Sequence, residues 1–527
     1  MPPNTVKWDE EYDVVVVGSG AGALVAALAA TKRGLSVALI EKTDLYGGTT
    51  AYSGGGMWFP NNEVEINAGV ADTPDLAREY LAGLMGDVAS PLMDAYLEAG
   101  PQLVAELMQN PDLDFWWMPF PDYYNTPGSL PRGRGIFPEE QAAVEVADLV
   151  DTVREPLWPP TDPLIWGHSM VARFLKALTK TDAVVRRGFA FEELVLAEGR
   201  VVGIRAESGG ESVFIRAEHG VLLACGGFDR DREMRQRYQA PLTGEWSLGA
   251  PGNTGDGIRA GIAIGAATDL MDQSWWTPGL LGPTGGASFL QGLHGGVIVN
   301  GAGERYANEC LPYDRFGREM LKGQATGVEH LTSHIVFDQE LLDTYGIPGS
   351  PDALYPGVDL EPWFDGGYLT KADTLEELAQ LIGLPSNALV ATVDRFNGFA
   401  KVGVDLDFQR GEDPYDLFFV APVESINGTL KQIRTGPFYA AKVVLSDLGT
   451  KGGLVCDEKA RVQDLSGDVI PGLYAAGNTM AAWSGEFYFG PGVPIGSSAA
   501  FAYLAVLDMA QRSASNSSPH FESADIN

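Results

Sequence analysis

Apolar runs and glycine-rich turns alternate along the first fifty residues of the chain. Residues 14–17 (VVVV) form a continuous β-branched run, which is typical of a parallel strand buried on both faces. A glycine-rich turn follows at residues 18–23, then an Ala- and Leu-rich segment, and then a second apolar run at residues 36–40. We therefore predict a strand–helix–strand unit. A membrane span over residues 14–30 is disfavoured, because the stretch is slightly short and contains Gly18 and Gly20.

The residue types at this turn are those that a dinucleotide requires. Gly18 permits a tight turn, Gly20 lets the backbone approach a pyrophosphate, and Ala23 allows the helix to pack closely on the strand. The helix N-terminus offers free N–H groups and the positive end of its dipole to the phosphates. Glu41 ends the second strand, 21 residues after Gly20, where an acid can bond a ribose hydroxyl. These features predict a nucleotide site that suits either NAD or FAD.

A second glycine-rich segment favours FAD. Lys42 follows Glu41, and residues 47–56 (GGTTAYSGGG) would let the backbone lie along the rest of an extended cofactor. We find no second dinucleotide fingerprint in the chain. We therefore expect electrons to pass directly to another acceptor rather than to a nicotinamide.

The pattern farther along the chain predicts a domain that is split by an insertion. Apolar runs at residues 184–186, 193–197, 201–206, 212–215 and 221–224 predict strands, with hairpin turns at 198–199 and 208–210. Residues 127–165 are Pro-rich and predict an irregular excursion, and residues 374–382 and 386–401 predict helices. We predict an α/β fold. A discontinuous Rossmann-like FAD-binding domain (1–274 and 444–511) holds an inserted α+β catalytic or cap domain (275–443), and a disordered tail (512–527) follows.

Composition excludes several classes of function. The 527 residues include 36 Lys and Arg against 70 Asp and Glu, a formal charge of −34, with no basic run longer than two residues. A nucleic-acid partner is therefore not expected, and membrane contact is expected to be peripheral at most. Cys225, Cys310, Cys456 and the six histidines fit no metal site or disulfide scaffold, so we expect no metal and a reducing, cytoplasmic compartment. Residues 1–12 are polar and acidic, so no signal peptide is expected.

Three tyrosine-bearing motifs carry the chemistry. They are residues 120–124 (FPDYY), 308–314 (NECLPYD) and 488–492 (YFGPG), the last just before a Ser- and Ala-rich segment. Together with the glycine pairs at 47–48 and 226–227 and the late segment 472–478 (GLYAAGN), they resemble the 3-ketosteroid Δ1-dehydrogenases of the fumarate reductase/ketosteroid dehydrogenase flavoprotein superfamily. The resemblance runs from about residue 12 to about residue 510, and the motifs stand in family order.

The resemblance implies FAD-dependent 1,2-desaturation of a 3-ketosteroid, such as 4-androstene-3,17-dione, in steroid degradation. The family roles place Tyr488 and the backbone N–H of Gly492 on the C3 carbonyl, where they act like an oxyanion hole. Tyr313 would remove the C2 proton, and the C1 hydride would pass to flavin N5. A hydroxyl that lowers the pKa of this base is assigned to Tyr123, although the adjacent Tyr124 could take that role. Asp314 is expected to be a structural hydrogen-bond partner rather than a base.

The same reasoning names the residues that would line the site. A helix predicted to begin near Ile495 would direct its N-terminus at the reduced flavin. Non-covalent FAD contacts are expected from Gly18, Ser19, Gly20, Ala21, Gly22, Ala23, Glu41, Lys42, Gly47, Gly48, Thr49, Thr50, Ser53, Gly54, Gly55, Ala224, Gly226, Asn253, Asp256, Gly477, Asn478, Gly492, Pro494 and Ile495. A flat hydrocarbon substrate requires an apolar pocket, for which the candidates are Trp58, Phe59, Trp117, Phe120, Phe487 and Phe489. Phe489 departs from the family pattern, in which a small residue or Pro usually follows the tyrosine.

Three other functions stay open at this point. A ketosteroid Δ4-(5α)-dehydrogenase would have much the same FAD elements. A fumarate-reductase-type enzyme would share residues 305–309 (RYANE), but it would need an Arg/His clamp for a dicarboxylate. A flavin-binding electron carrier would have no use for the tyrosine motifs. The electron acceptor is expected to be a quinone or a redox carrier.

Overall fold

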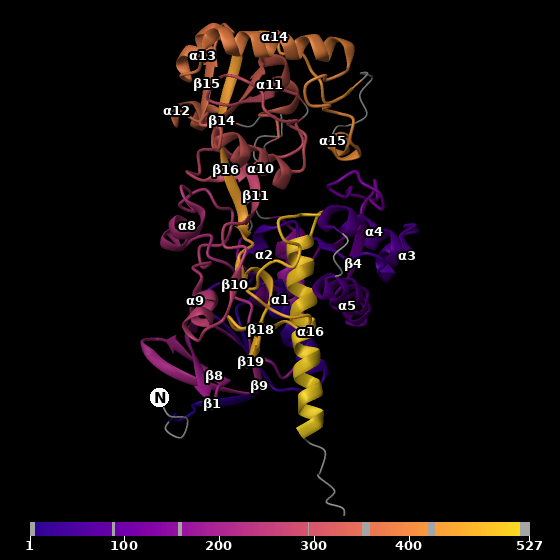
Figure 1. Cartoon of the computed structure of the whole chain (residues 1–527), viewed down its shortest axis with the longest axis vertical. Coiled ribbons are helices and arrows are strands. Elements are labelled where there is room, and N and C mark those ends of the chain that lie inside the picture. The colour runs from indigo at the N-terminus through magenta and orange to yellow at the C-terminus, as the bar shows by residue number, and fades with distance from the viewer. Residues whose placement is uncertain are drawn as a thin grey trace, which may run out of the picture.

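The computed structural model describes residues 6–86, 90–155, 161–293, 295–349, 359–419 and 427–516, with side chains as far as residue 512. The molecule is elongated (Figure 1). A mostly parallel sheet lies at one end and an antiparallel sheet at the other, and the long strand β16 (Phe438–Thr450) runs between the two ends.

The first sheet has eight strands in the order β18-β19-β9-β1-β2-β6, with β8 pairing β9 and β7 pairing β8. Its central pairs, β1–β2, β1–β9, β9–β19 and β2–β6, are all parallel. This arrangement confirms the predicted Rossmann-like core. The strands are β1 (Glu10–Val17), β2 (Val37–Glu41), β6 (Val184–Arg187), β7 (Ala190–Ala197), β8 (Arg200–Ser208), β9 (Glu211–Leu223), β18 (Arg461–Gln463) and β19 (Val469–Ala475).

Helices α1 (Ala21–Lys32) and α16 (Val493–Asn516) pack tightly against each other beside this sheet. Gly22 makes the close approach possible, because a Cβ atom there would lie 2.5 Å from Ser498 Oγ. Helix α16 begins slightly before the predicted Ile495 and continues to Asn516. The prediction of disorder from residue 512 is therefore wrong for residues 512–516, while residues 517–527 lie outside the described part of the chain.

By length and composition, α16 is apolar enough over Val493–Arg512 to cross a membrane, with a mean hydropathy of 1.4. In the structure, 61% of this apolar window is buried within the protein. Such burial is typical of a core helix. The earlier apolar stretch at residues 14–30 divides into β1 and α1, as predicted.

The hairpins predicted at residues 198–199 and 208–210 are confirmed, because β7, β8 and β9 pair antiparallel in sequence order. The strands predicted at 212–215 and 221–224 are instead the single strand β9. Its first part pairs with β8 and its second part with β1, and the β1 register shifts between Tyr12 and Val14. A bulge therefore carries the strand through the polar residues that were interpreted as a break.

The second sheet is antiparallel and has the order β12-β11-β16-β14-β13, with β15 also pairing β16. It has a hydrophobic core of its own, which extends from Trp276 to Leu445. The two predicted helices are confirmed as α13 (Leu375–Leu381) and α14 (Ser386–Val402). The other strands are β11 (Ser274–Leu281), β12 (Ala287–Phe289), β13 (Val297–Val299), β14 (Thr332–Asp338) and β15 (Leu369–Ala372).

The bounds predicted for the inserted domain, 275–443, cut through this second sheet. Strand β11 begins at Ser274, and β16 continues past Val443 to Thr450, where the two strands still pair. The described part of the Pro-rich residues 127–165 is irregular in places, but it includes β5 (Gly135–Pro138) and α6 (Ala147–Val150), and residues 156–160 lie outside the described part of the chain.

The remaining described elements connect or cover the two sheets. They are α2 (Gly48–Tyr52), β3 (Met57–Trp58), α3 (Glu63–Asn67), α4 (Pro74–Met85), α5 (Pro91–Leu107), β4 (Phe115–Met118), α7 (Trp166–Leu178), α8 (Arg232–Gln239), α9 (Asp256–Ala263), β10 (Thr268–Asp269), α10 (Tyr313–Gln324), α11 (Gln339–Tyr345), α12 (Glu361–Asp365), α15 (Pro414–Phe418) and β17 (Gly453–Leu454), with the 3-10 turns Ala143–Val146 and Gly477–Thr479.

Candidate active site

Three tyrosines from distant parts of the chain meet where the two sheets adjoin. The Tyr123 hydroxyl donates to the Tyr313 hydroxyl at 2.8 Å, and Tyr313 donates to the Tyr488 hydroxyl at 2.7 Å. Their ring centroids lie 5.1–5.4 Å apart, and all three side chains are buried. We call Tyr123, Tyr313 and Tyr488 the tyrosine cluster.

Separate elements hold the members of the tyrosine cluster. Tyr313 is the first residue of α10, and Tyr488 lies in the loop before α16. Tyr123 is tied to that same loop, because its backbone N–H donates to the carbonyl of Phe489 at 2.8 Å. The Tyr80 hydroxyl donates to this carbonyl as well, at 2.6 Å. Two segments more than 350 residues apart are therefore fixed to each other by their backbones.

The geometry distinguishes Tyr123 from its neighbour Tyr124. The Tyr123 hydroxyl reaches Tyr313, whereas the Tyr124 ring packs on Phe487 at 6.0 Å and under the Arg315 guanidinium at 4.9 Å. Asp314 accepts hydrogen bonds from the Trp276 backbone N–H at 3.2 Å and from Arg318 at 2.9 Å, as expected of a structural partner.

Burial raises the pKa of all three cluster tyrosines above 10.0. The hydrogen bond from Tyr123 works against this rise at Tyr313, because it stabilises the Tyr313 phenolate. At Tyr488 the opposing groups include the Tyr313 hydroxyl and the backbone N–H of Gly492. The Gly492 N–H therefore lies close to the Tyr488 hydroxyl oxygen.

Gly492 occupies a position that no other residue could fill. Its φ is +94°, and a Cβ atom would lie 2.4 Å from the carbonyl carbon of Gly56. It directly precedes α16, and its carbonyl accepts from the Gly496 N–H at 2.8 Å. The helix N-terminus and the Tyr488 loop are therefore joined at this glycine.

The predicted FAD residues form a continuous cradle over the carboxyl ends of β1 and β2. At Gly18, φ is +107° and a Cβ would lie 2.3 Å from the carbonyl oxygen of Ala224, so a side chain is impossible. Thr50 Oγ1 accepts from the Ala21 N–H at the start of α1, at 3.0 Å. Ser19 Oγ accepts from the Gly47 N–H at 3.0 Å and so links the two glycine segments.

The two polar residues at the end of β2 already have protein partners. Glu41 Oε2 accepts from Ser19 Oγ at 2.5 Å, and Glu41 Oε1 accepts from the backbone and hydroxyl of Thr43 at 2.9 Å, which leaves one further lone pair, on Oε2. Lys42 pairs with Asp256 at 2.6 Å. A ribose contact from Glu41 therefore has to share the carboxylate with Ser19 and Thr43.

The rest of the predicted set lies around the same cradle. Asn253 donates to Thr49 Oγ1 at 2.9 Å, which brings the middle segment onto the second glycine segment. Asn478 accepts from the Trp275 indole at 3.1 Å, close to the start of α16. Positive φ values occur at Gly47, Gly48, Gly55, Gly226 and Gly477, while Gly20, Gly22, Ala23, Ser53, Gly54, Pro494 and Ile495 lie in the same loops and helix starts. Most of these residues are glycine, alanine or small polar types, as backbone contacts to an extended dinucleotide would require.

The aromatic residues predicted for the pocket divide into two groups. Phe120 lies beside the tyrosine cluster, 6.1 Å from the Tyr123 ring. Phe487 is half-buried against Tyr124, and Trp117 packs under Arg132 at 4.7 Å.

The other three belong to the packed core. Trp58, Phe59 and Phe489 are 0% exposed, and Trp58 stacks between Tyr96 and Phe489. Phe59 packs on Tyr96 at 5.5 Å. Phe489 therefore places its backbone, rather than its ring, next to Tyr123.

Two aromatic residues of the site escaped the sequence analysis. Tyr415, on α15, lies 5.2 Å from the Tyr123 ring, and its buried hydroxyl has no hydrogen-bond partner among the described residues. Phe289, on β12, lies 4.7 Å from Tyr313. The Asp413-Pro414 pair is a helix-start signal that could have located α15, since Asp413 caps the Tyr415 N–H at 2.9 Å. No local signal connects either residue with the cluster.

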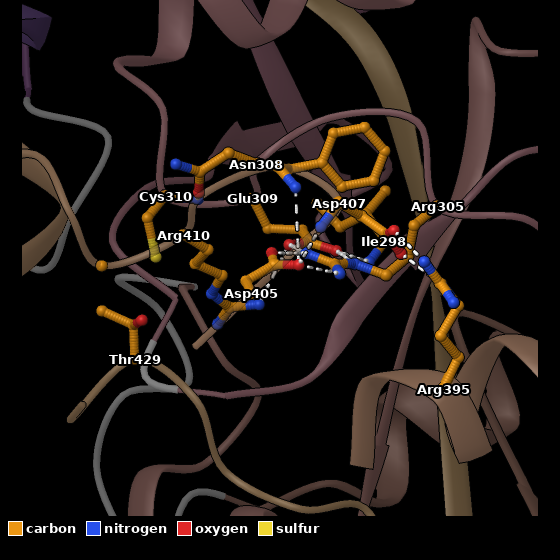
Figure 2. A network of polar contacts seen from close by, with 12 residues as sticks. Ile298, Arg305, Asn308, Glu309, Cys310, Arg395, Asp405, Asp407, Arg410 and Thr429 are labelled. Atoms are coloured by element: carbon orange, nitrogen blue, oxygen red, sulfur yellow. Dashed lines mark hydrogen bonds and ion pairs between the residues drawn. The ribbon is translucent and has the colours of Figure 1, made fainter. Parts of the chain in front are cut away.

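Arg305, in the motif shared with fumarate-reductase-type enzymes, is engaged in ion pairs away from the tyrosine cluster. Figure 2 shows Arg305 turned toward Glu309 and Asp405. Its Nε lies 2.7 Å from a carboxylate oxygen of Glu309, and its Nη2 lies 2.8 Å from one of Asp405. The Arg305 side chain is only 4% exposed. Its charge is therefore already neutralised and cannot hold a dicarboxylate near the tyrosine cluster.

The chain matches a known family over almost its whole length. The family model described as an FAD binding domain matches residues 13–495. The chain is 39% identical to the 3-oxosteroid 1-dehydrogenase of Mycolicibacterium smegmatis, over 96% of this chain and 98% of that protein.

Two solved structures are similar to this chain, one in both sequence and fold and the other in fold. The 3-ketosteroid Δ1-dehydrogenase of Sterolibacterium denitrificans, in complex with 1,4-androstadiene-3,17-dione, is 34% identical, with a TM-score of 0.90 and coverage of 95% of this chain and 100% of that one. The 3-ketosteroid Δ4-(5α)-dehydrogenase of Rhodococcus jostii is 23% identical, with a TM-score of 0.70 over 97% and 99%, and shares the fold. The chain belongs to the FAD-binding family of the 3-oxosteroid 1-dehydrogenases.

Proposed function

We propose that this protein is an FAD-dependent 3-ketosteroid Δ1-dehydrogenase, which introduces a C1–C2 double bond into a substrate such as 4-androstene-3,17-dione in steroid degradation. The observation that carries the proposal is the hydrogen-bonded row of Tyr123, Tyr313 and Tyr488, with the Gly492 N–H at its end. A polarised, enolisable ketone needs such a set of hydroxyls, whereas a dicarboxylate or a bare electron carrier does not.

Tyr488 and the N–H of Gly492 polarise the substrate. Tyr313 donates to Tyr488, and among the described residues the hydrogen of Tyr488 itself has no acceptor, so we assign it to the substrate. A C3 carbonyl oxygen placed between the Tyr488 hydroxyl and the Gly492 N–H would receive two hydrogen bonds. These bonds strengthen as the oxygen gains negative charge, and they therefore lower the barrier for loss of the C2 proton.

Once the Tyr313 hydroxyl has lost its own proton to solvent, the Tyr313 phenolate accepts the C2 proton, and Tyr123 supports it by donating a hydrogen bond to the phenolate. The electron pair of the C2–H bond forms the new C1–C2 double bond as hydride leaves C1. FAD, when bound, supplies the hydride acceptor. The residues that would hold it are the glycine segments around Gly18 and Gly47, with Asn253, Asn478 and the start of α16.

The test is direct. The purified flavoprotein is mixed anaerobically with 4-androstene-3,17-dione, flavin absorbance is followed and the product is identified. We expect bleaching and a product with a C1–C2 double bond. In a parallel reaction, 5α-androstane-3,17-dione tests the alternative, because a Δ4-(5α)-dehydrogenase would form a C4–C5 double bond. No bleaching, or a product without unsaturation at C1–C2, would refute the proposal.

We further propose that a quinone or a redox carrier reoxidises the enzyme, and that the enzyme works in the cytoplasm with at most peripheral membrane contact. The net charge of −34 opposes a close approach to an anionic bilayer, while a steroid and a quinone both partition into lipid. Reoxidation of the substrate-reduced enzyme by a soluble quinone, compared with that by oxygen, tests the first point. Fractionation of cells tests the second.

A further inference from the structure

Lys451 is a buried lysine beside the tyrosine cluster. It directly follows β16 and is 0% exposed. Its Nζ donates to the carbonyl oxygens of Glu486 and Phe487 at 2.7 and 2.9 Å, and it lies 4.2 Å from the centroid of the Trp275 ring. The Lys451 amino group thus interacts with two backbone oxygens and with the face of an aromatic ring.

A lysine is a costly residue to place here. Burial lowers the pKa of Lys451 to about 7, because the ammonium loses its hydration. The carboxylates of Asp314 and Glu486 favour its charge, but both are paired with Arg318, at 2.9 and 3.2 Å. A methionine would occupy similar space without this desolvation cost. The ammonium must therefore do something that packing alone would not require.

The position of the two carbonyls indicates what that is. Glu486 and Phe487 immediately precede Tyr488, so their peptide groups set where the Tyr488 ring begins. Arg318, on the helix that starts with Tyr313, donates to the same Glu486 carbonyl from the other side. Trp275, beneath the ammonium, contacts the Tyr488 ring edge-on at 5.1 Å. Arg318 joins the Tyr488 loop to the helix that carries Tyr313, and Lys451 joins the same loop to the end of β16.

We propose that Lys451 is a positioning residue for the desaturation. Its ammonium fixes the backbone ahead of Tyr488 and so keeps the Tyr488 hydroxyl at the point where it meets both Tyr313 and the substrate ketone. This inference rests on the proposed function. Because the hydroxyl contributes most when the ketone oxygen becomes negative, its displacement should slow the chemical step more than it weakens substrate binding.

Three variants test the proposal in the intact flavoprotein. Lys451→Met removes the donors, Lys451→Arg keeps a buried cation that can donate, and Lys322→Met makes the same change on α10 at a side chain that is 78% exposed. Anaerobic flavin reduction by 4-androstene-3,17-dione is measured over a range of substrate concentrations. We expect Lys451→Met to lower the limiting rate by ~30-fold and to change the half-saturation concentration by less than ~3-fold. Lys451→Arg should recover part of the rate, and Lys322→Met should match the wild type.

The outcomes separate this proposal from the one on which it rests. A wild-type protein that shows no flavin reduction overturns the proposed function and the role of Lys451 with it. A Lys451→Met protein that keeps the wild-type rate per bound FAD, or that loses rate only through weaker substrate binding, overturns the role of Lys451 alone. If Lys451→Met fails to fold, Arg318→Gln loosens the same carbonyl from the partly exposed side and should lower the limiting rate by ~5-fold. An unchanged rate there also overturns the proposal.

Discussion

Residues 305–313 contribute to two buried polar clusters that are built in opposite ways. Arg305 and Glu309 belong to an ion-pair cluster with Asp405 and Arg410, in which Arg305 pairs with both carboxylates and Arg410 pairs with Glu309, at 2.7–3.1 Å (Figure 2). Tyr313, four residues after Glu309, belongs to the tyrosine cluster, which consists of neutral hydroxyls. Residues 305–313 are thus held in place by the ion pairs of Arg305 and Glu309, and they contribute the neutral hydroxyl of Tyr313 to the candidate active site.

The two clusters differ in whether their polar groups are still free to form hydrogen bonds with a substrate. Glu309 accepts from both Arg305 and Arg410. Burial alone would raise the pKa of Glu309, but the charges of the two arginines outweigh it and hold the pKa below its usual value. Both carboxylates of this network are paired with arginines, and Arg410 Nε is its one buried polar atom without a partner among the described residues. Among the described residues, the tyrosine cluster keeps one hydrogen of Tyr488 uncommitted, and the hydroxyl of the neighbouring Tyr415 has no partner. Uncommitted polar groups in a dry site are costly for folding, but they are available to a substrate.

Among the variants considered, Tyr313→Phe, in the tyrosine cluster, should have the largest effect on function. We expect kcat to fall by about 1,000-fold, because the proton acceptor is lost, while the free energy of unfolding changes by less than ~1 kcal/mol. Steady-state kinetics per bound FAD and denaturant unfolding check the two halves. Tyr124→Phe, which removes a neighbouring hydroxyl outside the cluster, is the control. A Tyr313→Phe enzyme within tenfold of the wild-type rate would contradict the assignment of the base.

Glu309→Gln should do the reverse in the ion-pair cluster. Two buried arginines lose their shared carboxylate, so we expect the free energy of unfolding to fall by ~3 kcal/mol, with kcat of the folded fraction within about threefold of wild type. Urea unfolding monitored by tryptophan fluorescence gives the value. Asp407→Asn removes the partner of Arg395, whose side chain is 61% exposed, and should cost less than ~1 kcal/mol. Equal losses in the two variants would mean that burial does not distinguish these pairs.

The two clusters should also respond at opposite ends of the pH scale. Burial holds the pKa of Tyr313 above 10.0, so kcat/KM should rise with pH through the alkaline range as the base ionises. Tyr123→Phe removes a hydrogen bond that lowers this pKa and should move the rise to higher pH. The pKa of Glu309 is held below 4.5, so its contribution to stability is present above pH 4.5 and is lost as the pH falls through the lower, folded-state value.

Rate profiles and unfolding curves measured on the same buffers test this contrast. Glu309→Gln should remove part of the acid-side loss of stability and leave the alkaline rise in kcat/KM unchanged. A plateau of kcat/KM below pH 8 would contradict a tyrosine base, because even an unburied tyrosine, with a pKa of ~10, ionises only at higher pH. Another base would then have to be sought.

Sequence could predict what depends on neighbours in the chain. The β1–α1–β2 unit and its glycines were predicted correctly, because period, turn and helix start are local. The tyrosines were located only through the family resemblance, since the bonds that unite them span 190 and 175 residues. Lys451 and Tyr415 carry no motif at all. Their importance arises from contacts made only after two sheets have assembled.

Apolar residues show the same limit. Phe120 and Phe59 are the same residue type in similar surroundings along the chain, yet the first borders the tyrosine cluster and the second is 0% exposed in the core. Composition cannot separate a pocket wall from a core, because both exclude water. The bulged strand β9 was interpreted as two strands for a related reason, since its polar middle is tolerated only by its particular sheet partners.

Tyr415→Phe should give the smallest effect and the most informative one. The Tyr415 hydroxyl is buried without a partner among the described residues, and its pKa is raised by that burial. Removing it should raise the free energy of unfolding by about 1 kcal/mol, since an unsatisfied buried group is lost. The contrast with the paired charges of the ion-pair cluster predicts that the Tyr415 hydroxyl forms a hydrogen bond with the substrate. In that case, KM of the Tyr415→Phe enzyme should rise several-fold at nearly constant kcat. Denaturant unfolding and steady-state kinetics on one preparation measure both changes, with Tyr439→Phe as the control because that hydroxyl donates to Gln339 at 2.5 Å. A stability gain with an unchanged KM would show that the uncommitted hydroxyl is a packing defect, and that an open hydrogen bond near a catalytic cluster is not by itself a substrate contact.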